Sequence, residues 1–263
     1  MIVSRRAARA FASGCGNLKG VVFNGGMQPT MYDKMTTATA WLTFQLTIPS
    51  SGSASLRTTR DHIPMMAFAR DVAAAVNLVN GPNPPAWLLT FNEPDYSYMG
   101  WTPTMTPQQA ADAIKPLLAR PGTKTKYVAP VVAFTDSGWL DQFFAACKCR
   151  NFFSAYNIHQ YHPTAQEVIT NVKNFHNKYN DKPLWITEVA PGQAGCKVSW
   201  DAAGQFMREL YRFAKGSGWI DRIFWNSGNQ LTNGDQNVCN SWLVDPNGNP
   251  GPLLKTFEAM NCT

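Results

Sequence analysis

The chain has 263 residues, of which 44% are hydrophobic and 15% charged, so it can bury a large core, and an intrinsically disordered protein is excluded. The net charge is +6, but the Lys and Arg residues are scattered rather than gathered in a run with aromatic residues, so we expect no nucleic-acid partner. We also expect no membrane span, because no stretch approaches the roughly 20 apolar residues that one requires.

Short apolar runs alternate with amphipathic segments along the chain. The predicted strands cover residues 19–24, 39–48, 62–69, 87–91, 126–133, 152–162, 183–190 and 220–226. The predicted helices cover residues 70–79, 107–119, 139–147, 165–179, 201–214 and 253–260. This alternation is typical of an α/β protein with a single (β/α)8 barrel, in which some helices are short or missing. We assign residues 1–18 to an N-terminal extension and residues 19–263 to one barrel domain.

Two of the predicted strands end in the same way. Pro94 ends the strand at 87–91, because proline cannot donate to a sheet ladder. Asn92 and Glu93 therefore lie at the carboxyl end of that strand, where parallel sheets and barrels keep their active sites. The strand at 183–190 has the same pattern and carries Glu188 near its end.

Two carboxylates at facing strand ends supply what glycoside hydrolysis requires, a proton for the leaving oxygen and an attack on the anomeric carbon. Since two close carboxylates cannot both ionise at low cost, one should have a raised pKa and act as the acid. We assign the acid to Glu93 and the nucleophile to Glu188, with Asn92 bonding a sugar 2-hydroxyl and Tyr161 orienting Glu188. The alternative for each glutamate is a solvated loop carboxylate or a helix N-cap.

Other polar and aromatic residues at strand ends are candidates for binding sugar, whose rings pack on aromatic faces. His159 belongs to this group, with a satisfied core histidine as its alternative, and Trp225 is expected to be a sugar platform rather than a barrel plug. The further candidates are Asn226 beside Trp225, Tyr96 and Trp101 in the loop after Glu93, and Trp41 on the second strand. The last three could instead pack within a loop or the core.

Six cysteines favour an oxidising compartment. Cys15 with Cys262 and Cys196 with Cys239 are plausible pairs, whereas Cys147 and Cys149 are too close for an easy bridge. No CxxC pair or HExxH motif occurs, so we expect neither a metal nor a cofactor. No secretion signal is visible, because the arginines near the N-terminus are not followed by an apolar segment.

The ordered set of motifs resembles a known family. Asn92-Glu93-Pro94-Asp95 and Trp185-Ile186-Thr187-Glu188 are similar to the strand-four and strand-seven signatures of clan A retaining glycoside hydrolases. More narrowly, the chain resembles glycoside hydrolase family 128 over most of its length. The motifs that add to this likeness are Pro64-Met65, Met105-Thr106-Pro107, Trp139-Leu140 through Cys147 and Cys149, Ile158-His159-Gln160-Tyr161, and Trp225.

The resemblance implies a retaining endo-β-1,3-glucanase in which Glu93 is the acid/base and Glu188 the nucleophile. It also implies a β-glucan partner, and we expect a monomer in the extracellular space or cell wall. The chain departs from the family pattern at Trp41-Leu42-Thr43-Phe44-Gln45, where relatives tend to have Trp-Tyr-Tyr-Asn-Trp, and it lacks the Trp that often follows Pro-Met on strand three. The alternatives are a clan A hydrolase of mannan or β-1,4-glucan, a transglycosylase with the same residues, and a non-catalytic glucan-binding barrel.

Overall fold

The structure of the protein is a computed structural model. It describes residues 15–23, 33–47, 61–97, 104–192, 198–226, 240–245 and 247–262. The N-terminal extension expected at 1–18 therefore lies mostly outside the described residues, as do Trp101, Cys196 and Cys239.

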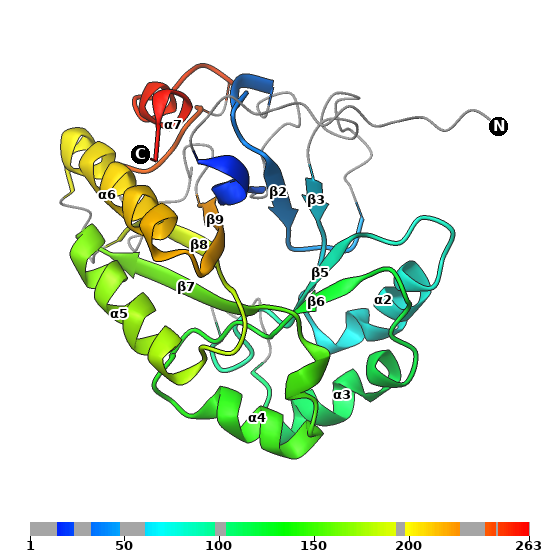
Figure 1. The fold of residues 1–263 in the computed structure, drawn as a ribbon. Coiled ribbons are helices and arrows are strands. Elements are labelled where there is room, and N and C mark those ends of the chain that lie inside the picture. The colour runs from blue at the N-terminus through cyan, green and yellow to red at the C-terminus, as the bar shows by residue number, and fades with distance from the viewer. Residues whose placement is uncertain are drawn as a thin grey trace.

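Strands and helices alternate as the sequence predicts, although several are shorter. The strands are β1 (Lys19–Phe23), β2 (Ala40–Thr43), β3 (Asp61–Ile63), β4 (Met65–Met66), β5 (Trp87–Thr90), β6 (Lys126–Val128), β7 (Tyr156–His162), β8 (Leu184–Pro191) and β9 (Ile220–Trp225). The helices are α2 (Val72–Val79), α3 (Pro107–Ala119), α4 (Trp139–Cys147), α5 (Ala165–Lys178), α6 (Trp200–Ser217) and α7 (Leu254–Ala259). Helices α2 to α6 form an arc outside the strands (Figure 1).

The strands pair in parallel, which gives the α/β fold that the sequence predicts. One sheet has the order β3-β2-β1-β9-β8-β7, and the other has the order β4-β5-β6. Pro64 separates β3 from β4, because proline donates no hydrogen bond to the ladder, so the third predicted strand is in two pieces. A parallel bridge between Val128 and Ala155 joins the end of β6 to the residue before β7.

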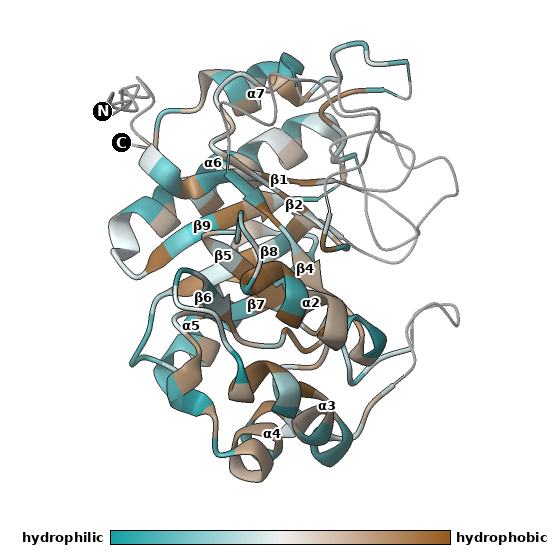
Figure 2. Ribbon diagram, turned by 90° about the vertical axis from the view of Figure 1, so that its right-hand side faces the viewer, coloured by the Kyte–Doolittle hydropathy of each residue, from teal (hydrophilic) through white to brown (hydrophobic). Residues whose placement is uncertain are grey.

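The two faces of the strands carry different buried clusters. The smaller cluster contains residues from strands of both sheets, such as Val22, Leu89, Trp185 and Phe224, and we call its side the inner face. Neighbouring strand residues belong to a larger cluster that includes the apolar sides of the helices, and we call its side the outer face. The apolar strands lie among helices that carry both polar and apolar residues (Figure 2). The switch of neighbouring strand residues between the inner and the outer face follows the two-residue period of a β-strand.

Within the described residues, disulfides join two pairs of cysteines. Cys15 bonds Cys262 as expected and ties the start of the described chain to its end. Cys147 also bonds Cys149, so the expectation that these two residues are too close was wrong. Lys148 between them adopts a left-handed backbone with φ of 52°, which turns the chain enough for the two flanking side chains to meet.

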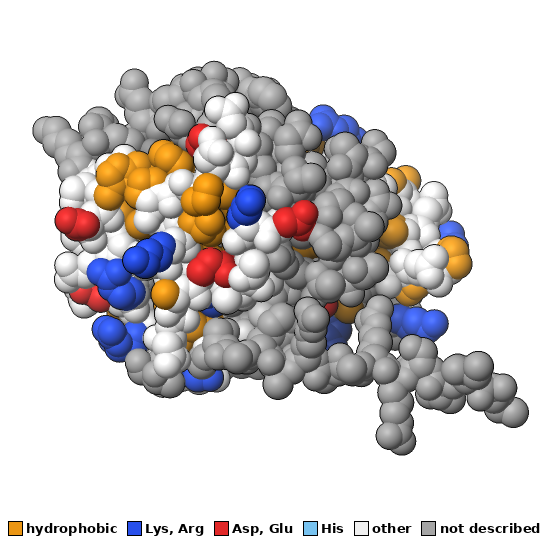
Figure 3. All heavy atoms as spheres, turned by 90° about the horizontal axis from the view of Figure 1, so that it is seen from above, with side chains coloured by type: hydrophobic (Ala, Val, Ile, Leu, Met, Phe, Trp, Pro, Cys, Tyr) orange, Lys and Arg blue, Asp and Glu red, His pale blue; other side chains and the backbone are white. Residues whose placement is uncertain are grey.

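Three further features concern the helices, the possible metal ligands and the surface charges. Within the described ranges, no helix combines the length and the apolar character that crossing a membrane requires. The same part of the chain holds no group of three or more His, Cys, Asp and Glu side chains placed to bind a metal. Basic and acidic side chains are interspersed on the face that Figure 3 shows, rather than separated by sign.

Candidate active site

Glu93 follows β5 and is held by its neighbours on both sides. The Asn92 N–H donates to Ala67 O at 3.1 Å and the Glu93 N–H donates to Val131 O at 2.9 Å, so the backbone is bonded to the segments after β4 and after β6. Glu93 adopts a φ of 44°, a left-handed conformation that costs a non-glycine residue about 1 to 2 kcal/mol. Such outliers concentrate at functional sites, because the surrounding structure must hold them in place.

Glu188 owes its direction to an irregularity in β8. Trp185 lies on the inner face and Ile186 on the outer face, so strict alternation would turn Glu188 outward. The register with β7 shifts between the pairs Ile158–Ile186 and His159–Glu188, which inserts Thr187 as an extra residue. Such a β-bulge re-aims the side chain that follows it. Glu188 therefore points to the same side as the β7 residues that it contacts.

His159 on β7 lies between the two glutamates. Its Nδ1 is 2.7 Å from Glu93 Oε1, and its Nε2 is 3.4 Å from Glu188 Oε1, an ion-pair distance without hydrogen-bond geometry. The His159 side chain is 2% exposed, against 20% for Glu93 and 10% for Glu188. A single imidazole ring with little solvent exposure thus contacts both carboxylates.

Tyr161 and Asn226 hold the other oxygen of Glu188. The Tyr161 hydroxyl donates to Glu188 Oε2, and Asn226 Nδ2 donates to the same oxygen at 3.2 Å. Asn226 Nδ2 also donates to the Tyr161 hydroxyl oxygen. Burial and the charge of Glu188 raise the pKa of Tyr161, so the phenol keeps the proton that it donates. The carboxylate is therefore oriented from two strands.

The charges of this cluster determine each other. Burial favours the neutral imidazole, but the carboxylates of Glu188 and Glu93 outweigh it, and the pKa of His159 is raised. Burial also favours the neutral form of Glu93, but the hydrogen bond and the charge of His159 outweigh it, and the pKa of Glu93 is lowered. The expectation of a raised pKa for Glu93 is therefore wrong for the protein without substrate, because it left His159 out.

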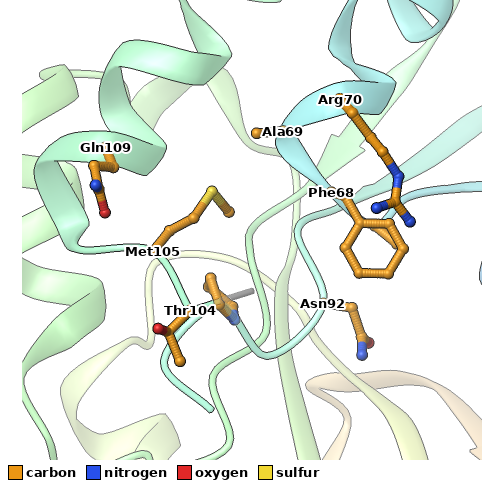
Figure 4. Close-up of a pocket in the computed structure, with 9 residues that line it drawn as sticks. Phe68, Ala69, Arg70, Asn92, Thr104, Met105 and Gln109 are labelled. Carbon is orange, nitrogen blue, oxygen red and sulfur yellow. The ribbon is translucent and has the colours of Figure 1, made fainter. Parts of the chain in front are cut away.

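A cavity of about 340 Å³ is lined by Asn92 and Pro94, the two residues that flank Glu93 in the sequence (Figure 4). Its lining includes Asn92 and Pro94 on one side and Phe68, Arg70 and Met105 on the others. The Arg70 guanidinium lies 4.1 Å from the centre of the Phe68 ring. Asn92 Oδ1 is buried and has no hydrogen-bond partner among the described residues, so it can accept a bond from a ligand hydroxyl. A polar ligand group can thus bind beside Asn92.

Two tryptophans named as candidates from the sequence lie away from this cluster. Trp225 and Trp41 are fully buried, and both belong to the outer face. Trp225 Nε1 donates to Ser241 O at 2.7 Å and its ring packs against Phe206, so the expectation of a sugar platform was wrong. Trp41 packs against His62, which is partly buried. Both cases follow from the alternation of side chains along a strand. A residue that directly follows or precedes an inner-face residue points to the outer face.

The loops after β5 and β6 bring an exposed aromatic pair to the same end of the strands. Tyr96 is 38% exposed, while Trp101 lies outside the described residues. Phe134 is 52% exposed, and its ring centre is 5.5 Å from that of Tyr96. Phe134 is not among the residues expected from the sequence, although it directly follows the predicted strand at 126–133.

Comparison with known proteins identifies a family. A protein-family model described as glycosyl hydrolase catalytic core matches residues 20–257. A search of curated proteins by sequence gave no significant match.

Solved structures with the same fold include glycoside hydrolase family 128 proteins. A subgroup II endo-β-1,3-glucanase from Sorangium cellulosum is 24% identical, with a TM-score of 0.73 over 92% of this chain and 98% of that one. A subgroup V exo-β-1,3-glucanase from Cryptococcus neoformans is 18% identical, with a TM-score of 0.75 over 91% and 97%. A subgroup VII oligosaccharide-binding protein from Trichoderma gamsii is 16% identical, with a TM-score of 0.69 over 92% and 93%. At these identities the likeness extends to the fold, which is common to enzymes and a binding protein.

Proposed function

We propose that this chain, which belongs to the glycosyl hydrolase catalytic core family, is a retaining endo-β-1,3-glucanase with Glu93 as acid/base and Glu188 as nucleophile. The observation that carries the proposal is the contact of both carboxylates with the one imidazole of His159, at 2.7 and 3.4 Å. The solved structures with the same fold include β-1,3-glucanases, which supports the choice of substrate.

In the first step, a Glu188 oxygen attacks the anomeric carbon while the bond to the leaving oxygen breaks. Glu93 delivers the proton to that oxygen. It can draw this proton from His159 through the hydrogen bond that joins the two side chains. Attack removes the negative charge of Glu188, which weakens the hold of His159 on its own proton and favours the transfer.

In the second step, Glu93 takes a proton from water, and the water oxygen displaces Glu188 from the anomeric carbon. The two displacements together retain the configuration of that carbon. Tyr161 and Asn226 keep Glu188 in line for both steps, since both donate to its Oε2. Asn92 Oδ1 is suited to accept a bond from a sugar hydroxyl, because it is buried without a partner among the described residues. We also propose that the strands close into a (β/α)8 barrel, which the bridge between Val128 and Ala155 and the continuity of β3 with β4 support.

The test is the release of reducing ends from laminarin, with carboxymethyl cellulose and mannan measured alongside. We expect laminarin to be the preferred substrate and Glu188→Ala to lose at least about 1,000-fold in kcat. Glu209→Ala on α6 is the matched control, because within the described part of the chain the Glu209 side chain accepts a bond only from Gln205 on its own helix. Preferential turnover of mannan or cellulose would replace the substrate and leave the residue roles in place.

A glucan-binding protein without catalysis is the second candidate, and the fold it would have is that of the Trichoderma gamsii oligosaccharide-binding protein. The presence of both glutamates on one imidazole favours the enzyme, since a binding role requires neither a buried acid nor an oriented nucleophile. Binding of laminarin without turnover of any of the three glycans would establish the binding protein instead. The two disulfides are consistent with an extracellular location, which we propose on this ground.

A further inference from the structure

We propose that the buried hydrogen bond between Thr187 and Asn157 positions the nucleophile Glu188, because it holds the bulge of β8 that aims this carboxylate. The inference rests on the proposed function and extends it, since it names two positioning residues beneath the carboxylate cluster. Both residues act through the direction of Glu188 rather than on the substrate.

The extra residue of β8 is present against both neighbouring strands. Over Ile186–Val189 the strand advances three residues, while its partners on β7 advance two, over Ile158–Gln160. The register with β9 also shifts between Ile186 and Val189. An inserted residue is left out of the ladder and disrupts it locally. Contacts of the side chains must therefore help to hold this part of β8 in place.

Thr187 and Asn157 meet on the inner face of the strands. Thr187 follows the outer-face residue Ile186, so alternation turns it inward. Asn157 lies between Tyr156 and Ile158, which both belong to the outer face, so it points inward as well. The Thr187 hydroxyl donates to Asn157 Oδ1. This bond joins the inserted residue of β8 to β7 independently of the ladder.

Water has little access to this bond. Thr187 is 0% exposed and Asn157 is 1% exposed. Asn157 Nδ2 has no hydrogen-bond partner among the described residues, so the bond from Thr187 is the one found there for this side-chain amide. A shift of Thr187 would leave Asn157 Oδ1 buried without a donor, which is costly in a dry interior. The bond therefore resists a change in the shape of the bulge.

The bond lies one layer beneath the carboxylate cluster. Asn157, His159 and Tyr161 are alternate residues of β7 and share its inner face. A parallel strand rises about 3.3 Å per residue, so Asn157 is about 7 Å below His159 along the strand. Asn157 accepts from Thr187, and two layers above it Tyr161 donates to Glu188. One face of β7 thus holds both residues of the bulge, and loss of the lower bond allows Glu188 to turn away from His159.

Thr187→Val removes the hydroxyl and keeps the branched shape of the side chain. We expect kcat on laminarihexaose to fall by about 10- to 100-fold with little change in KM, because a displaced nucleophile slows the chemical step more than it weakens binding. Thr187→Ser should recover most of the loss, because it keeps the donor. Thr39→Val is the matched control, since Thr39 is also buried and its hydroxyl donates to Lys19 O at 3.0 Å, at the amino ends of β1 and β2. It should lower stability without lowering kcat.

Asn157→Leu removes the acceptor and provides a second test. Since the two residues act through one bond, the double variant Thr187→Val/Asn157→Leu should lose no more of kcat than either single variant. Losses that multiply in the double variant would mean two separate effects and would overturn the inference. An unchanged kcat in Thr187→Val, or a rise in KM alone, would overturn it as well.

The direction of Glu188 can also be measured without a substrate. Burial favours the neutral form of His159, but the carboxylate of Glu188 raises its pKa, and Glu93 and Asp95 raise it further. A Glu188 side chain that turns away should therefore lower the pKa of His159. NMR titration of the His159 ring, assigned from its absence in His159→Gln, compares the wild-type protein with Thr187→Val and Thr187→Ser.

A lower pKa of His159 in Thr187→Val alone would support the positioning role. This result would stand even if the wild-type protein cleaves no glycan, in which case the proposed function fails by itself. The same pKa in all three proteins would overturn the inference.

Discussion

His159 and Glu93 are joined by a 2.7 Å hydrogen bond between Nδ1 and Oε1, although 66 residues separate them in the sequence. The bond links β7 to the end of β5 and moves the two pKa values in opposite directions, upward for His159 and downward for Glu93. His159 also faces Glu188, so the charges of both glutamates act on the same ring. The protonation state of His159 therefore depends on all three residues of the cluster.

Replacing His159 should change the pH profile of the reaction. In His159→Gln, Glu93 loses the hydrogen bond and the charge that lower its pKa, so we expect the limb of the kcat/KM profile that Glu93 sets to move to higher pH. His162→Gln is the matched control, since His162 lies on the same strand and bonds Asn171 instead. A profile that keeps its limbs in His159→Gln would contradict the coupling.

The same variant should alter the dependence of stability on pH. The pKa of folded His159 is raised above its ordinary value of 6.5, so the folded protein holds this proton over a window in which the unfolded chain releases it. The contribution is fully present below pH 6.5 and is lost as the pH rises through the folded pKa. Urea unfolding of the wild-type protein and His159→Gln should therefore show a difference in free energy that shrinks with rising pH, and a growing difference would refute the sign.

The donors to Glu188 should affect catalysis more than binding. We expect Tyr161→Phe and Asn226→Ala to lower kcat by about 10- to 100-fold with a smaller effect on KM, because they orient the carboxylate that attacks. Tyr179→Phe is the control, since its hydroxyl bonds Asp141 on α4 and its loss should cost only about 1 kcal/mol of stability. A rise in KM with an unchanged kcat in the two site variants would assign them to substrate binding.

The two disulfides should contribute different amounts to the free energy of unfolding. Cys15–Cys262 spans 247 residues, and removing it should lower the free energy of unfolding by about 2 to 4 kcal/mol. A cross-link that closes a long loop takes the most conformational entropy from the unfolded chain. Cys147–Cys149 spans two residues, and its loop-closure contribution is below about 2 kcal/mol. Denaturation of the two Cys→Ser double variants measures the difference, and equal losses would contradict the loop-length argument.

The stereochemical course tests the assignment of a nucleophile. Double displacement predicts that the β-anomer of the product appears first, before mutarotation mixes the two forms. Proton NMR during the first minutes of laminarihexaose cleavage distinguishes the anomers. Initial release of the α-anomer would mean a single displacement by water, in which case Glu188 acts as a base.

Much of the architecture could be predicted from signals that act within a few residues. Pro94 marks the strand end that carries Glu93, and the bounds of α3 and α4 agree with those predicted. At α3, the Thr106 hydroxyl accepts a bond from the Gln109 N–H, and the Gln109 side chain accepts one from the Thr106 N–H. Four consecutive residues therefore specify where the helix begins. The identity of both glutamates as candidates came from the same kind of pattern.

The directions of the side chains were decided by the tertiary structure. Trp225 is at a strand end, as predicted, yet it faces outward, because direction follows the alternation set by Phe224 beside it. Thr187 forms the bulge that turns Glu188 toward Tyr161, and this shift exists only in the pairing of β8 with β7. His159 meets Glu93 across strands that are distant in sequence. Sequence alone determined which residues end the strands, since those signals are local, whereas the register between neighbouring strands decided which of them meet.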